Sequence, residues 1–224
     1  MNRLDIIYED AAVLVVRKPA GLAVQTKRLG QKDLESMLKN HLVQNGKQPY
    51  IGIIHRLDQP VEGILVFAKT TKAAAALSAQ AAEKTKGMKK EYLAIVCGKP
   101  EQEQGTLRNW LKKDGKTNLS SVVTKGTSDA KEAILDYEVL GYKEDVNRAL
   151  IRIHLKTGRH HQIRVQMAHA GMPLYGDSKY NPNPVGGTVA LCAYRLTFVH
   201  PVSGKYMTFS CEPKNSAFAG FAIE

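Results

Sequence analysis

The part of this chain that most limits its possible folds is residues 50–68, where two short apolar stretches flank a polar turn. The stretches, residues 50–54 and 63–68, are rich in β-branched residues, which is typical of buried strands. The turn carries Arg56 and Asp58, two residues apart. Because an unpaired carboxylate near a core is costly, an aspartate kept there usually has a partner or a task. The segment therefore predicts a sheet with a candidate functional turn, against the simpler alternative of a turn-forming aspartate before Pro60.

Hydrophobic periodicity along the rest of the chain predicts more strands than helices. Strands are expected at residues 4–8, 13–16, 92–97, 133–140, 149–155, 189–199 and 205–211, and a hairpin or insertion at 102–127. Helices are expected at residues 32–45, with Gly46 as a stop, at 71–84, with Thr71 as the cap, and between Thr157 and Gly171. Strands and helices do not alternate strictly, which favours an α+β fold around a largely antiparallel sheet. No repeat or long linker divides the chain, so residues 1–224 are expected to form one domain.

The charge balance and the cysteines narrow the classes of protein. The 32 Lys and Arg residues against 21 Asp and Glu give a net charge of +11, which favours a polyanionic partner such as nucleic acid. A basic surface that only aids solubility is the alternative. Three scattered cysteines without a Cys-x-x-Cys pair argue against a disulfide framework or a thiolate zinc site. With no signal-peptide pattern and no apolar run of membrane-spanning length, a cytoplasmic protein without a membrane partner is expected.

A second polar cluster lies where a strand is expected to end and a helix to begin. A helix N-terminus offers unpaired N–H groups to an anion, so side-chain donors there predict a phosphate-binding corner. The candidate RNA-binding donors are Lys156, Arg159, His160, His161 and Gln162. A solvated helix start is the alternative. A metal site with His154 and His169 is not expected, because adjacent helical histidines diverge by about 100° and no acidic or cysteine ligand is suitably spaced.

Five ordered segments of the chain resemble the RluA-type pseudouridine synthase family. HRLDQPVEGILVFAKT is similar to its central motif, KEYLAIVCG to its tyrosine motif, and TGRHHQIRVQMAHAGMPLYGDSKY to its third motif. YEDAAVLVVRKPAGLAVQ and AYRLTFVHPVSGK are similar to the sheet segments at the two ends of the catalytic domain. One tetrapeptide would be weak evidence, whereas five segments in the expected order are specific. The resemblance implies the pseudouridine synthase fold, as a stand-alone catalytic domain without an S4-like RNA-binding module.

The resemblance also implies roles for single residues. Asp58 matches the aspartate that is essential for catalysis in the family, and Arg164 matches the arginine that pairs with it. Tyr92 matches the tyrosine that packs on the uracil ring, although taken alone it is typical of a half-buried strand tyrosine. Arg56 matches the residue that enters the RNA helix when the target uridine is flipped out.

The chain departs from the family pattern at a few positions near these residues. Val61 and Glu62 stand where the family commonly has Thr-Ser, His160 stands in place of a threonine, and Gln166 in place of a histidine. None of these changes removes a residue with an implied role. Activity is therefore expected, and substrate choice is the property that the departures put in doubt.

The implied activity is isomerisation of uridine to pseudouridine in structured ribosomal or transfer RNA. Nothing is oxidised or hydrolysed, so no metal, redox cofactor or nucleotide cofactor is expected, and a monomer is the default for the family. A paired arginine lowers the pKa of a carboxyl group, so Arg164 is expected to keep Asp58 ionised. Whether Asp58 attacks the sugar, attacks uracil or acts as a base at C2′ stays open. The alternatives are a non-catalytic RNA-binding protein and a glycosidase using Asp58 and Glu62, which is disfavoured because glycosidases need an acid and a base across the scissile bond.

Overall fold

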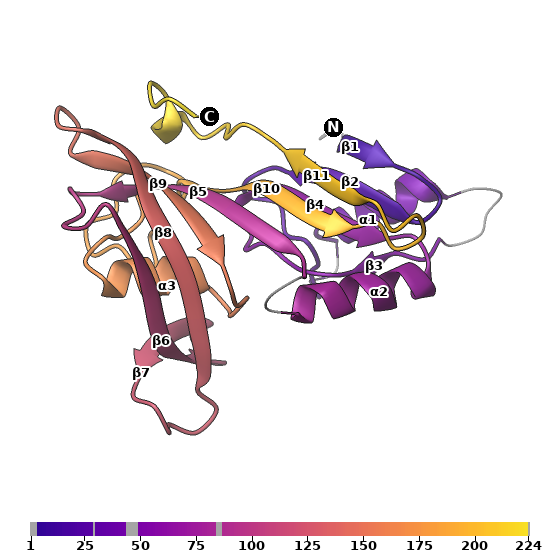
Figure 1. Ribbon diagram of the computed structural model, residues 1–224, viewed down its shortest axis with the longest axis horizontal. Coiled ribbons are helices and arrows are strands. Elements are labelled where there is room, and N and C mark those ends of the chain that lie inside the picture. The colour runs from indigo at the N-terminus through magenta and orange to yellow at the C-terminus, as the bar shows by residue number, and fades with distance from the viewer. Residues whose placement is uncertain (1–3, 29, 44–48, 84–86, 224) are drawn as a thin grey trace. The chain divides into compact units, whose positions relative to one another are not determined.

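The computed structural model describes residues 4–28, 30–43, 49–83 and 87–223 (Figure 1). The chain divides into two compact units, each of which is described by itself. Unit 1 comprises Met1–Lys90 and Ala193–Glu212, and unit 2 comprises Glu91–Cys192 and Pro213–Glu224. Two of the three divisions fall within strands, since the strands that begin at Lys89 and Leu191 each cross from one unit into the other, and the third follows Glu212.

Unit 1 is an antiparallel sheet with helices α1 and α2. Its strands follow the spatial order β1-β2-β4-β10, with β3 pairing with β4 and β11 with β10. The elements are β1 (Asp5–Glu9), β2 (Val13–Lys18), α1 (Leu34–Leu42), β3 (Gly52–Ile53), β4 (Glu62–Ala68), α2 (Thr71–Ala82), most of β10 (Leu191–Val199) and β11 (Tyr206–Ser210). The core joins Val13 and Val15 of β2 to Ile64 and Val66 of β4 and to Leu77 of α2. Every residue of β4 is buried, as its β-branched, apolar sequence predicts.

A glycine at the start of β4 permits a close approach between two strands. Gly63 has a φ of +126°, and a Cβ added there would overlap the backbone of Ala193 in β10. Only glycine combines this backbone conformation with this contact. The residue therefore fixes where β4 begins, immediately after the turn that carries Asp58.

Unit 2 is a second antiparallel set of strands, in the order β5-β9-β8-β6-β7 (Figure 1). The elements are β5 (Lys89–Cys97, apart from its first two residues), β6 (Gln104–Asp114), β7 (Leu119–Val123), β8 (Lys131–Lys143), β9 (Arg148–Leu155), α3 (Gln162–His169) and the 3-10 turn η1 (Ser216–Phe218). Helix α3 lies against β6 and β7. Val165 of α3 packs with Leu111 of β6 and Ala133 of β8.

Gln166, one of the departures from the family pattern, fastens α3 to the sheet of unit 2. Its side chain is fully buried, and Nε2 donates to Asn109 Oδ1 at 2.8 Å and to the carbonyl oxygens of Leu107 and Ala133 at 3.2 Å. These contacts are internal packing contacts. This departure therefore acts on the placement of α3.

The architecture confirms the predicted α+β fold with a largely antiparallel mixed sheet. A hairpin or an insertion was predicted at residues 102–127, and the structure has a hairpin there, formed by β6 and β7. The prediction of Thr71 as a helix cap was wrong by one residue, because the Thr70 side chain accepts from Ala73 N–H. Helix α1 begins later than predicted, because Asp33 caps it by accepting from Ser36 N–H. Gly46, its expected stop, lies outside the described residues. Gly171 does end α3, in the left-handed conformation with a φ of +77°.

Candidate active site

The turn that carries Asp58 is anchored by its apolar neighbours. Val61 N–H donates to the Asp58 carbonyl oxygen at 3.0 Å, which closes the turn between β3 and β4. Leu57 and Val61 are buried, whereas Arg56 is exposed and Asp58 is half-buried. The buried side chains of Leu57 and Val61 thus anchor the turn to the core of unit 1. The two predicted functional side chains, Arg56 and Asp58, are more exposed.

Lys18 is a residue of this site that the sequence did not predict. It ends β2 and is fully buried, and its Nζ donates to the carbonyl oxygens of Pro19 at 2.9 Å, Leu22 at 2.7 Å and Gln59 at 3.1 Å. Burial lowers the pKa of Lys18 to about 8, while the negative charges of Asp58 and Glu62 raise it. An ammonium group is therefore buried within electrostatic range of the candidate catalytic carboxylate.

The loop after Lys18 and the Asp58 turn are joined by reciprocal hydrogen bonds. Gly21 N–H donates to the Gln59 carbonyl oxygen at 2.8 Å, and Gln59 Nε2 donates to the Gly21 carbonyl oxygen at 3.0 Å. Gly21 has a φ of +86°, which favours glycine. The Gln59 carbonyl oxygen also accepts from Lys18 Nζ. Gln59 is therefore the residue that connects the loop after Lys18 to the turn that carries Asp58.

Glu62, the unusual residue after the turn, is buried and forms an ion pair. Its Oε2 lies 3.5 Å from Arg17 Nη2, and both side chains are largely shielded from solvent. Glu62 is therefore the ion-pair partner of Arg17 on the neighbouring strand β2. This position argues further against its use as the second carboxylate of a glycosidase.

His55 lies three residues before Asp58 and is an isolated polar group. Both of its ring nitrogens are buried and have no hydrogen-bond partner among the described residues. Burial, together with a smaller effect of the positive charge of Lys90, lowers the pKa of His55 to about 3. Burial also lowers the pKa of Lys90. The imidazole is therefore neutral at physiological pH.

In unit 2, Arg164 is buried on α3 beside a carboxylate that the sequence reasoning also missed. Its Nε and Nη2 donate to the two oxygens of Asp177, at 2.8 and 2.6 Å. The Arg164 guanidinium also lies over the ring of Tyr180, 5.3 Å from its centroid. The signal for Asp177 was the segment GDSKY, which was used for the resemblance without a role for its aspartate. For Lys18, the signal was the second of two charged residues that end β2, after the apolar run Val13–Val16.

Tyr92 lies in β5, opposite Ile153 of β9, and only 6% of its surface is exposed. Asp58 belongs to unit 1, whereas Tyr92 and Arg164 belong to unit 2. Within unit 2, Arg164 is brought together with Asp177 and Tyr180. The pairing of Arg164 with Asp58 and the stacking by Tyr92 stay predictions.

The predicted phosphate-binding corner has outward and inward members. Lys156 is exposed and pairs with Asp136 at 3.0 Å, and Arg159 is half-buried with Nε donating to the Glu132 carbonyl oxygen. Gln162 is 3% exposed, and its Oε1 accepts from Arg159 N–H at 2.9 Å. Gln162 is therefore a buried residue that holds the backbone of the corner at Arg159.

The two histidines of this corner are held by their neighbours. The rings of His160 and His161 stack at 3.8 Å. His160 Nδ1 lies 2.9 Å from Ser120 Oγ, and His161 Nδ1 lies 2.7 Å from the Tyr180 hydroxyl. Because Ser120 N–H also donates to that hydroxyl, β7, Tyr180 and the start of α3 form one hydrogen-bonded network.

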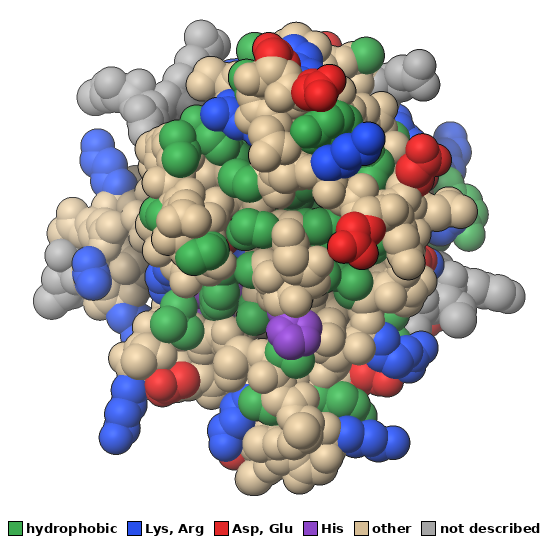
Figure 2. All heavy atoms as spheres, turned by 90° about the vertical axis from the view of Figure 1, so that its left-hand side faces the viewer, with side chains coloured by type: hydrophobic (Ala, Val, Ile, Leu, Met, Phe, Trp, Pro, Cys, Tyr) green, Lys and Arg blue, Asp and Glu red, His purple; other side chains and the backbone are tan. Residues whose placement is uncertain are grey.

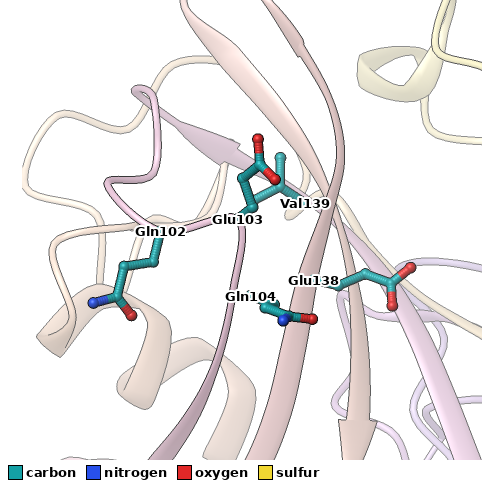
Figure 3. A pocket seen from close by; sticks show the side chains of 5 residues that line it. All are labelled: Gln102, Glu103, Gln104, Glu138 and Val139. Carbon is teal, nitrogen blue, oxygen red and sulfur yellow. The ribbon is translucent and has the colours of Figure 1, made fainter.

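A depression of about 480 Å³ elsewhere in unit 2 does not have the arrangement of a catalytic site. It is lined by Gln102, Glu103, Gln104, Glu138 and Val139. Figure 3 shows that these side chains point in different directions and do not converge on one point. Glu138 is also paired with Arg152 at 3.0 Å. This depression is therefore not taken as the candidate active site.

Two further observations bear on the partners. Among the described residues, no group of three His, Cys, Asp or Glu side chains is arranged to hold a metal ion. No helix in the described part of the chain is long and apolar enough to cross a membrane.

Comparison with known proteins gives a consistent result. The family model described as RNA pseudouridylate synthase matches residues 12–169. An uncharacterized RNA pseudouridine synthase, YhcT of Bacillus subtilis, is 34% identical over 96% of this chain and 71% of its own length. Ribosomal large subunit pseudouridine synthase D of Neisseria meningitidis is 36% identical over 96% of this chain and 59% of its own length.

A solved structure shares the fold. Human RNA pseudouridylate synthase domain containing 1 superposes with a TM-score of 0.75 at 22% identity, over 94% of this chain and 84% of that one. The chain spans between 59% and 71% of the length of the two bacterial relatives.

Proposed function

The chain belongs to the RNA pseudouridylate synthase family, and from this membership we propose that it isomerises specific uridines in structured RNA to pseudouridine. Ribosomal and transfer RNA are the proposed substrates, and the name of the Neisseria relative favours ribosomal RNA. The observation that carries the proposal is Asp58, the family's catalytic aspartate, on a turn anchored by Lys18 and Gln59.

The reaction determines what the site has to do. The N1–C1′ bond of uridine breaks, the uracil turns, and C5 joins C1′, while the hydrogen on C5 leaves as a proton and N1 takes up a proton. The electrons balance without an oxidant or reductant. The site must therefore hold a flipped base, keep it close to a carboxylate during the turn, and exclude competing water.

Three residues are proposed to carry out these tasks. Asp58 is the catalytic carboxylate, Arg164 is its charged partner, and Tyr92 stacks against the uracil ring. Stacking of a base on an aromatic side chain contributes roughly 1–3 kcal/mol. This assignment requires the two units to act as one catalytic domain, which is part of the proposal.

The RNA contacts are proposed from hydrogen-bond donors on exposed and half-buried side chains. Arg56 is exposed next to the Asp58 turn and is proposed to fill the space that the flipped base leaves, since a guanidinium stacks well. Lys156, Arg159 and His160 are proposed as phosphate contacts, with His161 and Gln162 supporting them from behind. Figure 2 shows one face of the molecule, on which the basic and acidic side chains of the described residues are interspersed.

A cytoplasmic monomer without a cofactor is proposed as the working form. The relatives named as ribosomal enzymes are bacterial, and ribosomes occupy the cytoplasm of bacteria. Sedimentation of the purified protein over a range of concentrations tests the monomer.

The experiment that tests the function uses total RNA from a strain that lacks this gene. Wild-type protein is added, and pseudouridine is mapped chemically across all RNA species. We expect new modified sites, which identify the substrate. Asp58→Asn is expected to bind the same RNA and to form no product.

A matched variant controls for the loss of a carboxylate. Asp145→Asn changes an exposed aspartate in the turn between β8 and β9 and is expected to form product at the wild-type rate. Wild-type protein that binds the RNA without forming pseudouridine would favour the non-catalytic RNA-binding alternative. Full activity in Asp58→Asn would overturn the assignment of the catalytic residue.

A further inference from the structure

Arg164 and Asp177, both of unit 2, are buried charged residues. Arg164 is 3% exposed and Asp177 is 1% exposed, so both charged groups are removed from water. A buried guanidinium without a counter-charge would be strongly unfavourable. Because Asp177 supplies that charge in direct contact, the pair is neutral and can stay buried.

The contact is a fork, which fixes orientation as well as charge. A guanidinium carries five N–H groups in one rigid plane. Asp177 Oδ2 accepts from Nε at 2.8 Å and Oδ1 accepts from Nη2 at 2.6 Å. Two parallel hydrogen bonds on one edge fix the plane of the group, so its opposite edge has a set direction. Nη1 and the second N–H of Nη2 lie on that opposite edge, where a second carboxylate can be bound.

Asp177 is itself held by the backbone around it. Asp177 N–H donates to the Leu174 carbonyl oxygen at 3.3 Å, and Oδ1 accepts from Lys179 N–H at 3.0 Å. The preceding Gly176 has a φ of +72°, and a Cβ added there would overlap the Thr188 carbonyl. The carboxylate is therefore fixed by a loop conformation that only glycine permits.

Tyr180 restricts the same guanidinium from its face. The Tyr180 ring lies 5.3 Å from Arg164 Cζ, and its hydroxyl is held by Ser120 N–H at 2.8 Å. Contacts on one edge and one face leave the group little freedom to rotate. The Arg164 guanidinium is therefore held in one orientation by Asp177 and Tyr180.

We propose that Asp177 is a positioning residue for the isomerisation: it fixes the plane of the Arg164 guanidinium and thereby the direction of the N–H donors on its opposite edge. The inference rests on the proposed function, which assigns Arg164 as the charged partner of the catalytic carboxylate. Asp177 acts through Arg164 and does not touch the substrate. A misplacement of about 1 Å in a catalytic group can slow a reaction on the order of 10²-fold.

A double-mutant cycle tests the proposal. RNA labelled with tritium at C5 of uridine is prepared from a strain lacking the gene, and tritium release is measured in single turnovers. The variants are Asp177→Asn, Arg164→Met and the combination of the two. We expect Asp177→Asn to lower the rate on the order of 10²-fold without changing the RNA concentration for half-maximal rate. The double variant is expected to be no slower than Arg164→Met, because the role of Asp177 depends on the arginine.

The outcomes separate positioning from a purely structural role. Losses that multiply in the double variant would overturn the proposal, because Asp177 would then contribute independently of Arg164. The control is Glu138→Gln, which breaks the more exposed pair with Arg152 in the same unit and is expected to keep the wild-type rate. A wild-type protein that releases no tritium would refute the proposed function, whereas an active wild type with multiplicative losses refutes only this inference.

Asp177→Glu keeps the test decisive if the neutral variants fail to fold. Its charge still compensates Arg164, but its extra methylene displaces the fork. Folded protein with a slow rate supports positioning. Folded protein with the wild-type rate would show that charge compensation alone is needed, which contradicts the proposal.

Discussion

Lys18 is a fully buried cation in unit 1 and Arg164 is a buried cation in unit 2, and the two are stabilised in different ways. In unit 1, the three hydrogen bonds of Lys18 Nζ all go to backbone carbonyl oxygens. In unit 2, Arg164 is bound by a full negative charge, the carboxylate of Asp177. Carbonyl dipoles satisfy the hydrogen-bond donors of an ammonium group, but they do not neutralise its charge.

The difference shows in the protonation of the two groups. Burial lowers the pKa of Lys18 to about 8, so this cation can lose its proton close to physiological pH. An arginine side chain stays charged in proteins. The protein thus has a titratable cation near Asp58 and a permanent one on α3, and the following predictions test this contrast.

The largest effect is expected for removal of the permanent cation. Arg164→Met leaves the buried Asp177 carboxylate uncompensated, which lowers the free energy of unfolding by about 3–5 kcal/mol. Urea denaturation measures the loss. The variant Arg164→Met with Asp177→Leu removes both charges and is expected to recover most of the stability. An equal loss in the single and double variants would show that Asp177 is not paired with Arg164.

A smaller effect is expected for the carbonyl-bound cation. Lys18→Met removes three hydrogen bonds, each contributing about 0.5–1.5 kcal/mol, but it also removes the cost of burying a charge. We therefore expect the free energy of unfolding to fall by about 2–3 kcal/mol. Lys39→Met, which breaks a half-buried pair with Glu35 between neighbouring turns of α1, is the control and is expected to have little effect. A loss for Lys18 as large as that for Arg164 would remove the contrast.

The pH dependence of stability tests the titration of Lys18 directly. Its pKa is about 8 in the folded protein and 10.5 ordinarily, so between these values the unfolded state binds more protons. The free energy of unfolding therefore rises with pH in this window, by about 1–2 kcal/mol between pH 8 and 9.5. Lys18→Met is expected to lack this rise. If denaturation midpoints of wild type and variant run parallel across the window, Lys18 does not titrate as stated.

The sequence predicted the positions of the elements better than the partners of the charges. The strands at residues 4–8 and 13–16 and the last hairpin follow from apolar patterns, because burial of one strand face is a local property. Asp58 and Arg164 were found through ordered motifs. These features depend on residues close together in the chain.

Lys18 and Asp177 could not be recognised in this way. One of the three carbonyl oxygens that bind Lys18 Nζ belongs to Gln59, 41 residues away in the chain, and it must lie beside the end of β2. The fork on Arg164 needs a loop with Gly176 in a left-handed conformation to bring Asp177 back to α3. Both depend on tertiary approach, which hydrophobic periodicity does not encode.

The smallest effect is expected at His55, whose ring nitrogens have neither kind of partner among the described residues. Its pKa is about 3 in the folded protein against 6.5 ordinarily, so on acidification the unfolded state binds the proton first. The free energy of unfolding then falls by about 0.5–1 kcal/mol between pH 7 and 6. His55→Phe is expected to keep the wild-type stability at pH 7, because replacing an unpartnered polar group with an apolar one is nearly neutral, and to lack this fall.

Thermal melts at pH 7 and 6 measure both effects, and His169→Gln, at an exposed histidine, is the control that should keep the wild-type pH dependence. If His55→Phe destabilises the protein at pH 7 by more than the cost of one hydrogen bond, about 1 kcal/mol, its nitrogens have a partner in solution. Unit 1 would then hold a second buried nitrogen group with a specific contact, three residues from Asp58. The contrast between the units would then extend to neutral as well as cationic groups.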